Sequence, residues 1–213
     1  MLAELKIKVC GMKDTGNIRN LVKCDPDLIG FIFFAGSKRY IRDHNPEIFG
    51  IIPDGIKKVG VFVNETVEEI KRIIKHLGLD IAQLHGDETP GECNDLRDSG
   101  IPVIKAFRIS DSIENKILED YVSFCDYFLF DTHDAGFGGT GKQFDWTALD
   151  GYRMPTPYFL SGGIGPENIE EIFMLNQPAL AGLDINSRFE TEPGIKDIHK
   201  VGHFIQSIRR RQK

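Results

Sequence analysis

Cysteine is scarce in this chain, and the cysteines that are present follow no recognisable pattern. There are four, none of them in a C-x-x-C pair, at Cys10, Cys24, Cys93 and Cys125. A scattered set in a chain of this length is typical of reduced thiols rather than of a disulfide framework. The cysteines and histidines also lack the spacing of zinc ligands, so we expect no bound metal. Reduced thiols are typical of the cytoplasm, where we expect the protein to act.

Long apolar runs and an excess of basic charge are missing as well. No stretch approaches the roughly 18–20 apolar residues that span a bilayer, and residues 1–4 do not resemble the start of a signal peptide. The 26 Lys and Arg against 32 Asp and Glu give a formal net charge of −6, whereas nucleic-acid-binding surfaces are usually basic. The one dense basic run, at residues 209–211, is typical of a solvated helix end. We therefore expect neither a membrane nor a nucleic acid as a partner.

The composition is that of an ordinary globular domain. Hydrophobic residues make up 41% and charged residues 27% of the 213 residues, which excludes a disordered chain. This length corresponds to one large domain and can bury a core without disulfides or metals. Because no linker or change in composition marks a boundary, we expect residues 1–213 to form a single domain.

Eight short β-rich runs recur along the chain. Most are continuous apolar stretches rather than alternations of apolar and polar residues, which indicates strands buried on both faces, as in a parallel sheet covered by helices. The runs are residues 5–9, 28–34, 57–63, 81–84, 103–107, 127–130, 158–161 and 179–185.

Helical patterns occupy the segments between these runs. Apolar residues spaced i, i+3, i+4 and i+7 recur at residues 70–77 and 201–208. Asp14 and Thr66 are candidate N-caps, and Pro166 suits the first turn of a helix. Eight strands, each followed by a helix-length segment, predict an α/β protein with a (β/α)8 TIM barrel. The alternative, an open doubly wound sheet, would be expected to carry a Gly-x-Gly-x-x-Gly turn after the first strand, which this chain lacks.

In such a barrel the chemistry lies at the carboxyl ends of the strands, and glycine-rich segments of this chain fall there. Gly162 and Gly163 follow the seventh strand and Ser187 follows the eighth, which is the usual phosphate position. Backbone N–H groups bind an anion there; the alternative is that the glycines only make tight turns. Residues 136–142 nearly match a P-loop, but Gln143 replaces its Ser or Thr, so we interpret this segment as a glycine flap.

Two residues at strand ends are candidates for acid–base chemistry. Cys10 directly follows the first strand, near Lys13, whose positive charge would lower the pKa of a thiol; the alternative is a small core residue. Asp131 ends the apolar run 127–130, where desolvation raises the pKa of a carboxyl group and suits a general acid. For Asp131 the alternative is a helix cap or a turn residue.

Two further candidates follow the second and fourth strands. The guanidinium of Arg39 is a candidate fork for a substrate carboxylate, with an ordinary solvated side chain as the alternative. His85 would point into the barrel mouth, although a lone histidine is more often structural than catalytic.

The motifs of this chain, in their order, resemble those of the phosphoribosylanthranilate isomerase family of tryptophan biosynthesis. Two of the matching stretches, Leu-His-Gly-Asp-Glu and Gly-Gly-Thr-Gly…Phe-Asp-Trp, are specific to this family among phosphate-binding barrels. The matching stretches are residues 6–11, 30–33, 37–40, 59–64, 83–88, 131–132, 138–141 with 144–146, 161–163 with 166–168, and 190 with 193–197.

The resemblance implies an Amadori rearrangement without a cofactor. The substrate would be N-(5-phosphoribosyl)anthranilate, and the product 1-(2-carboxyphenylamino)-1-deoxyribulose 5-phosphate. By the family's pattern, Asp131 is the general acid that protonates the ribose ring oxygen. Cys10, as a thiolate, takes the proton from carbon 2 of the resulting Schiff base.

The resemblance also implies the substrate contacts. Arg39 would hold the anthranilate carboxylate, while Asp184, facing the ribose hydroxyls, and His85 would be further substrate-binding residues. The phosphate would be held by Gly138, Gly139, Gly141, Gly162, Gly163 and Ser187. No segment has the pattern of a dimerisation helix or a coiled coil, so we expect a monomer.

Two positions depart from the family's pattern, and other functions are open alternatives. Lys38 replaces a proline, which could loosen the second loop, and Arg188 replaces a glycine near the phosphate. A histidine-pathway isomerase would use two carboxylates and show two similar halves, and a thiamine-phosphate synthase would need a magnesium–pyrophosphate site. A phosphate-binding barrel without catalytic activity is the alternative from another class.

Overall fold

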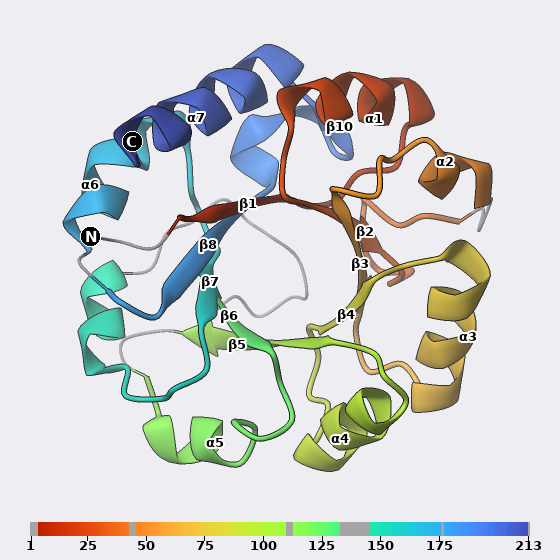
Figure 1. The fold of residues 1–213 in the computed structure, drawn as a ribbon, viewed down its shortest axis with the longest axis vertical. Helices are drawn as coiled ribbons and strands as arrows, with labels where there is room; N and C mark the ends of the chain where they lie inside the picture. Colours follow the sequence, from red (N-terminus) through yellow and green to blue (C-terminus); the bar gives the residue numbers. More distant parts are fainter. Residues whose placement is uncertain (1–3, 43–45, 110–112, 133–144, 176, 213) are drawn as a thin grey trace.

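Eight parallel strands close into a barrel in the computed structural model, which describes residues 4–42, 46–109, 113–132, 145–175 and 177–212. Each strand pairs with the next, and β8 pairs with β1, with Lys8 opposite Asp184. The ring is seen end-on in Figure 1. This closure confirms the predicted (β/α)8 barrel and rules out the open sheet. The strands are β1 Lys6–Val9, β2 Leu28–Ile32, β3 Lys57–Phe62, β4 Ile81–Leu84, β5 Val103–Ile109, β6 Tyr127–Thr132, β7 Tyr158–Leu160 and β8 Leu180–Ile185.

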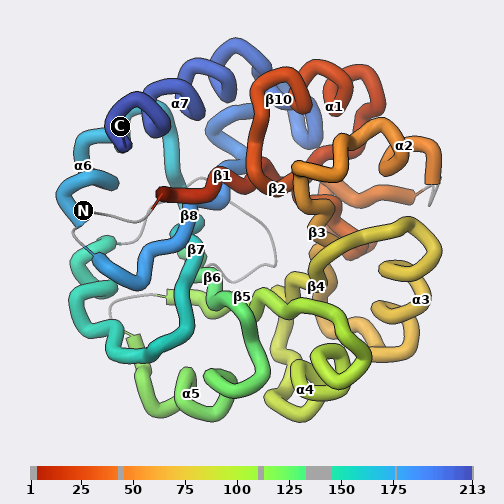
Figure 2. Tube along the Cα trace, in the orientation of Figure 1, coloured from red at the N-terminus to blue at the C-terminus, as the bar shows by residue number. Residues whose placement is uncertain are grey.

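Helices form a ring outside the strands, and α7 lies beside α1 (Figure 2). The α-helices are α1 Thr15–Leu21, α2 Pro46–Gly50, α3 Val67–Leu77, α4 Pro90–Asp98, α5 Asn115–Glu119, α6 Ile169–Met174 and α7 Ile198–Arg211. Short 3-10 helices are η1 Val22–Cys24, η2 Trp146–Gly151, η3 Pro166–Asn168 and η4 Ser187–Phe189. In the part of the chain that the structure describes, no helix is long and apolar enough to cross a membrane.

The predicted helix starts are confirmed. The Asp14 carboxylate accepts a hydrogen bond from Asn17 N at 2.6 Å and caps α1. Thr66 Oγ1 accepts one from Glu69 N at 3.3 Å and caps α3. Pro166 opens the 3-10 turn that precedes α6. The side chains of Asp14 and Thr66 satisfy backbone N–H groups that have no partner inside the helix, which is why α1 and α3 begin there.

The strands separate two cores because successive side chains of a strand point to opposite faces. The larger core lies between the strands and the helices. A smaller cluster fills the barrel: Leu28, Val59, Ile81, Ile104, Ala106, Leu129 and Phe159. The same alternation places Lys8 and Cys10 on the inner face of β1, Gln83 on that of β4, and Asp131 on that of β6. A polar layer therefore lies above the apolar plug at the carboxyl ends of the strands.

A small hairpin after β8 was not predicted. Its strands, β9 Glu190–Glu192 and β10 Ile195–Lys196, are antiparallel, with Lys196 opposite Glu190. Gly194 joins them with a φ of 90°, a backbone conformation that favours glycine. The hairpin brings two charged side chains back toward the ends of β1 and β2.

A buried ion pair fixes the loop after β4. Lys105 Nζ lies 3.0 Å from Glu88 Oε2, and the two side chains are 3% and 2% exposed. Lys105 also donates to Gly86 O at 2.8 Å. Glu88 accepts from the backbone N–H groups of Gly86 and Asn64 at 2.9–3.0 Å. Nearly every polar atom of the pair therefore has a partner, which offsets the cost of burying both charges.

We predict that Lys105→Met destabilises the fold by about 3–5 kcal/mol, because it leaves the Glu88 charge buried without its cation. The matched control is Lys57→Met, which breaks the exposed ion pair with Asp80 and should cost less than about 1 kcal/mol. Urea unfolding of both variants measures the difference. Equal losses would contradict a structural role for the buried pair.

Candidate active site

Cys10 follows β1 directly and shares a small space with Lys8. The Cys10 side chain is buried, and so is the Lys8 ammonium below it. A Cβ on Gly30 would lie 2.8 Å from Cys10 Sγ and 3.0 Å from Lys8 Nζ. Glycine at position 30 of β2 thus leaves the room in which the thiol and the ammonium meet.

The ammonium of Lys8 is paired with Asp184 across the β1–β8 seam. Lys8 Nζ lies 2.9 Å from Asp184 Oδ1, and the two side chains are 0% and 5% exposed. Burial would lower the pKa of Lys8, but Asp184 and Cys10 outweigh it and hold that pKa above its ordinary value. Burial raises the pKa of Asp184, which Lys8 opposes. Lys8 therefore remains a cation beside the thiol.

The thiol of Cys10 has two buried cations near it and is itself buried. Burial raises its pKa above the ordinary value, and Lys8 and Lys196 oppose that rise. The sequence expectation of a thiol pKa lowered by Lys13 is therefore wrong, because desolvation outweighs the neighbouring positive charge and the cations that act are Lys8 and Lys196. In the free protein Cys10 is a neutral thiol at neutral pH.

Asp131 lies at the end of β6, where its carboxylate is oriented from two sides. Asp131 Oδ1 accepts from Thr132 N at 2.8 Å, and Oδ2 lies 3.4 Å from His85 Nε2. The other ring nitrogen, His85 Nδ1, lies 2.9 Å from Gln83 Nε2. The side chains of His85 and Asp131 are 19% and 16% exposed, so both are accessible from the barrel mouth.

Arg39 is buried, and its guanidinium is already held by a carboxylate. Its Nε lies 2.9 Å and 3.1 Å from the two oxygens of Glu190, and its Nη2 lies 2.7 Å from Glu190 Oε2. Arg39 is buried, so the alternative of an ordinary solvated side chain is wrong. Part of its guanidinium is already occupied by Glu190. An incoming carboxylate would meet the remaining edge of the guanidinium.

Lys196 completes a charged triad with Arg39 and Glu190. Its Nζ lies 2.7 Å from Glu190 Oε1 and donates to Asn186 Oδ1 at 2.7 Å. Burial lowers the pKa of Lys196 to about 8, although Glu190 opposes that shift. The triad therefore carries a net positive charge at neutral pH and loses it above about pH 8.

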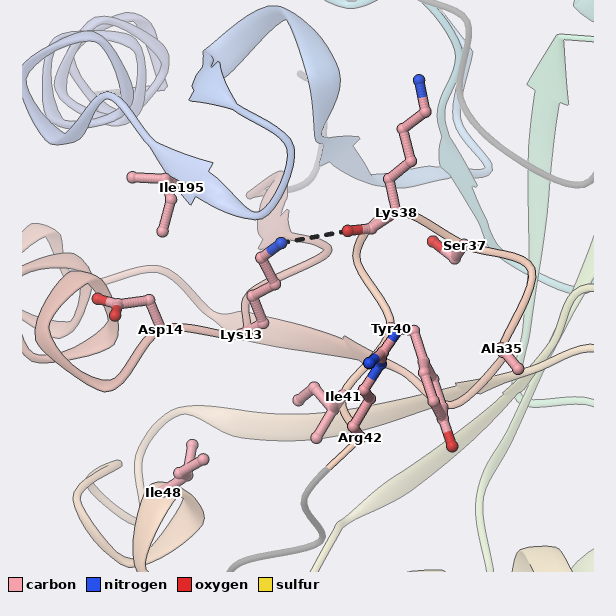
Figure 3. Close-up of a pocket in the computed structure, with 10 residues that line it drawn as sticks. All are labelled: Lys13, Asp14, Ala35, Ser37, Lys38, Tyr40, Ile41, Arg42, Ile48 and Ile195. Atoms are coloured by element: carbon pink, nitrogen blue, oxygen red, sulfur yellow. Dashed lines mark hydrogen bonds between the residues drawn. The ribbon is translucent and has the colours of Figure 1, made fainter.

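The loop that carries Arg39 is held by hydrogen bonds despite the lysine at position 38. Lys13 Nζ donates to Lys38 O at 3.2 Å (Figure 3). Arg39 N donates to Ser37 Oγ at 3.1 Å, and Tyr40 forms a bridge with Ile32 of β2.

A pocket of about 570 Å³ lies on the side of this loop that faces α1 and α2 (Figure 3), and none of its lining residues is a predicted site residue.

The glycine loop after β7 is fitted closely to Asp131. Gly162 and Gly163 have φ values of 83° and 68°. A Cβ on Gly162 would lie 2.7 Å from Thr132 N and 2.9 Å from Asp131 Oδ1. Ser187 begins the 3-10 helix after β8. The predicted phosphate residues Gly138, Gly139 and Gly141 lie outside the described residues.

Arg188 lies against the same loop. Its Nη1 donates to Gly163 O at 3.3 Å, and its Nη2 pairs with Glu167. Both side chains are partly exposed, at 40% and 53%. The side chain that replaces the family's glycine thus adds a cation near the predicted phosphate position, with an anion beside it.

The structure brings Cys10, Asp131, Arg39, His85 and Asp184 to one end of the barrel, with the described phosphate residues beside them. Sequence reasoning did not assign roles to four buried polar residues that support them: Lys8, Gln83, Glu190 and Lys196. Lys8, Gln83 and Lys196 are charged or amide side chains next to apolar residues or glycine. That unusual placement was the sequence signal that could have indicated a buried polar role. Among the residues with described positions, no group of three or more His, Cys, Asp or Glu could hold a metal ion.

We predict that Gly162→Ala destabilises the fold more than Gly78→Ala does. Both glycines have positive φ, and in the described part of the chain no neighbouring atom would lie within 4 Å of a Cβ added to Gly78. Gly78→Ala should therefore cost only the backbone strain, about 1–2 kcal/mol. Gly162→Ala adds the clash with Thr132 and Asp131. Thermal or urea unfolding measures both losses, and equal losses would show that the loop moves away freely.

Comparison with known proteins gives one consistent result. The family model for N-(5'-phosphoribosyl)anthranilate (PRA) isomerase matches residues 7–207. An N-(5'-phosphoribosyl)anthranilate isomerase of Parabacteroides distasonis is 46% identical over 204 residues, which are 95% of this chain and 92% of the relative.

Solved structures agree. A phosphoribosylanthranilate isomerase from Thermus thermophilus matches with a TM-score of 0.81 and 26% identity, over 97% of this chain and 99% of that one. Another, in complex with reduced 1-(o-carboxyphenylamino)-1-deoxyribulose 5-phosphate, matches with a TM-score of 0.77 and 30% identity, over 96% and 98% of the two chains. This chain belongs to the N-(5'-phosphoribosyl)anthranilate isomerase family.

Proposed function

We propose that this chain isomerises N-(5-phosphoribosyl)anthranilate to 1-(2-carboxyphenylamino)-1-deoxyribulose 5-phosphate in tryptophan biosynthesis, with Asp131 as general acid and Cys10 as general base. The observation that carries the assignment of roles is the placement of a thiol over a buried cation at the end of β1 and of an oriented carboxylate at the end of β6. The reaction moves protons within one molecule and has no net oxidation, so it needs no redox cofactor.

Asp131 would act first. Its carboxyl group protonates the ring oxygen of the ribose, and the bond between that oxygen and carbon 1 breaks to give a protonated Schiff base. The hydrogen bond from Thr132 N holds one carboxyl oxygen, which leaves the other to face the substrate and His85. A positioned acid of this kind typically contributes about 10²–10⁴ in rate.

Cys10 would act second. The Schiff base acidifies the hydrogen on carbon 2, and Cys10, whose own thiol proton passes to solvent as the cationic intermediate forms, removes it as a thiolate to give an enolamine. The enolamine then gains a proton at carbon 1 and loses the one on its carbon 2 hydroxyl, which gives the ketone. The raised pKa of the free thiol means that the thiolate is scarce before the substrate binds. The positive charge of the Schiff base adds to those of Lys8 and Lys196 and favours the thiolate when it is needed.

The charged groups around the pair suit the two ends of the substrate. The Arg39–Glu190–Lys196 triad, with its net positive charge, would receive the anthranilate carboxylate. Backbone N–H groups of Gly162, Gly163 and Ser187, together with the loop containing Gly138, Gly139 and Gly141, would hold the phosphate. Asp184 and His85 would lie toward the ribose hydroxyls, and Arg188 would add a cation at the phosphate end.

The enzyme would act as a single-domain monomer in the cytoplasm. Large apolar side chains are seldom exposed in the described ranges: Ile117 and Met174 are the two examples. All four cysteines are free thiols, which suits a reducing compartment. Sedimentation of the purified protein tests the oligomeric state, and a dimer mass would contradict the proposal.

The activity is tested by following the loss of phosphoribosylanthranilate fluorescence. The substrate is generated in situ from anthranilate, EDTA is added to one of two assays when formation is complete, and the protein is then added. We expect fast decay in both assays, and slow spontaneous decay with a Cys10→Ser/Asp131→Asn double variant. No decay with the folded wild type would contradict the proposed function.

We predict that Cys10→Ser and Asp131→Asn each lower kcat at least about a hundredfold, the effect expected for a lost base or acid. Both variants should fold, since each side chain changes little in size. Cys24→Ser, which alters a half-buried thiol of the outer helices, is the control and should leave kcat unchanged. Near-normal turnover in either site variant would remove that residue from the mechanism.

We predict that Lys196→Met raises KM in a pH-dependent way. The wild-type Lys196 is charged below about pH 8 and neutral above it, so it attracts the substrate carboxylate only at the lower pH. The ratio of variant to wild-type KM should be roughly fivefold at low pH, or about 1 kcal/mol of attraction, and should approach one well above the pKa. A ratio that is independent of pH would contradict this role.

A further inference from the structure

Gln83 is a buried polar residue that the mechanism above does not use. It lies on the inner face of β4 and is 1% exposed. One end of its amide, Nε2, contacts His85 Nδ1 at 2.9 Å. The other end, Oε1, is buried and has no hydrogen-bond partner among the described residues. A buried amide with one unsatisfied end is unfavourable compared with an apolar side chain of the same size, so its presence points to a role for the contact with His85.

The contact with Gln83 couples the orientation of its amide to the tautomer of His85. When Gln83 Nε2–H donates to Nδ1, the neutral ring carries its proton on Nε2, which then faces the Asp131 carboxylate. When the amide turns by half a rotation, Oε1 accepts from Nδ1–H instead. Nε2 is then free to accept a hydrogen bond from the O–H of a protonated Asp131. The two ends of the amide thus match the two protonation states of the acid.

We propose that Gln83 is a positioning residue of the reaction, which acts through His85 to orient the Asp131 carboxyl group and to support it both with and without its proton. This inference rests on the proposed role of Asp131. In the carboxyl state, His85 Nε2 accepts a hydrogen bond from the Asp131 carboxyl group until the ring oxygen of the substrate takes that proton. In the carboxylate state that follows, His85 Nε2–H stabilises the negative charge. Gln83 would act through its contact with His85 and not on the substrate itself.

Other charged groups also lie near the relay, by which we mean the contacts from Gln83 to His85 and from His85 to Asp131, and they contribute to its electrostatic environment. Asp184 on β8 interacts with both Asp131 and His85, and Lys8 on β1 neutralises Asp184. Asp87 follows His85 and pairs with Arg108 of β5 at 2.9 Å. A substitution at Gln83 leaves these charged residues in place. A difference between the variants and the wild type can therefore be assigned to the change at position 83.

Two variants separate the positioning role from a merely structural one. Gln83→Met keeps the length of the side chain and removes both the donor and the acceptor. Gln83→Glu keeps the shape and offers only an acceptor, whose negative charge favours a doubly protonated His85. For both variants, kcat and KM are measured across pH, and the ring nitrogens of His85 are observed by ¹⁵N NMR.

We expect Gln83→Met to lower kcat about 10–100-fold, as for other residues that orient a functional histidine, with KM within about twofold of the wild type. Its ¹⁵N signals should show that the preference of His85 for one tautomer is lost. Gln83→Glu should give imidazolium signals at neutral pH and, because that cation stabilises the Asp131 carboxylate, should shift the pH profile of kcat to lower pH. Because glutamate has the same shape as glutamine, Gln83→Glu should fold, and it tests the inference even if Gln83→Met does not fold.

Unchanged His85 signals and an unchanged pH profile in folded variants would overturn the inference. So would equal losses of kcat in both variants with no shift in the profile, since that result indicates only a packing role. A wild type that is inactive in the fluorescence assay would contradict the proposed function instead. Activity of the wild type with indifference to Gln83 substitution would contradict this inference alone.

Discussion

The buried ion pair between Lys8 and Asp184 is the interaction on which the site depends. It joins the first and last strands of the barrel at a depth where both side chains are almost fully buried. Barrel interiors are usually filled by branched apolar residues, and apolar residues often stabilise a fold more than a buried ion pair does. The pair is explained by what it does for its neighbour: it keeps a permanent cation beside the Cys10 thiol.

The triad of Arg39, Glu190 and Lys196 forms a second group of charges near the Lys8–Asp184 pair. Cys10 therefore has cations from two groups near it. The hairpin after β8 carries Glu190 and Lys196 to Arg39 and builds a triad whose net charge is positive at neutral pH. Burial still keeps the free thiol neutral. In the proposed mechanism, the Cys10 thiolate would therefore be a strong base that is scarce until a cationic intermediate forms next to it, which would tie the second proton transfer to the first. The relay of Gln83 and His85 gives Asp131 comparable support.

Local patterns predicted the barrel, which the structure confirms, and they indicated candidate site residues, but they did not indicate the partners of those residues. Each continuous apolar run became a strand, because burial on both faces leaves a strong local signal. The hairpin was missed because its two strands are short and largely polar. The pairing of Arg39 with Glu190, 151 residues apart, follows only from barrel closure. Gln83 was overlooked because an amide within a buried run gives no period of its own.

The most direct test of this account is a titration of the Cys10 thiol, followed by the ultraviolet absorbance of its thiolate. Subtracting the titration of Cys10→Ser isolates the signal of this residue. In the free protein the pKa of Cys10 should lie above that of an ordinary thiol. It should rise further in the double variant Lys8→Met/Asp184→Asn, which removes the cation without leaving a buried charge. An ordinary pKa for the wild-type thiol, or one that does not respond to loss of the pair, would contradict the account.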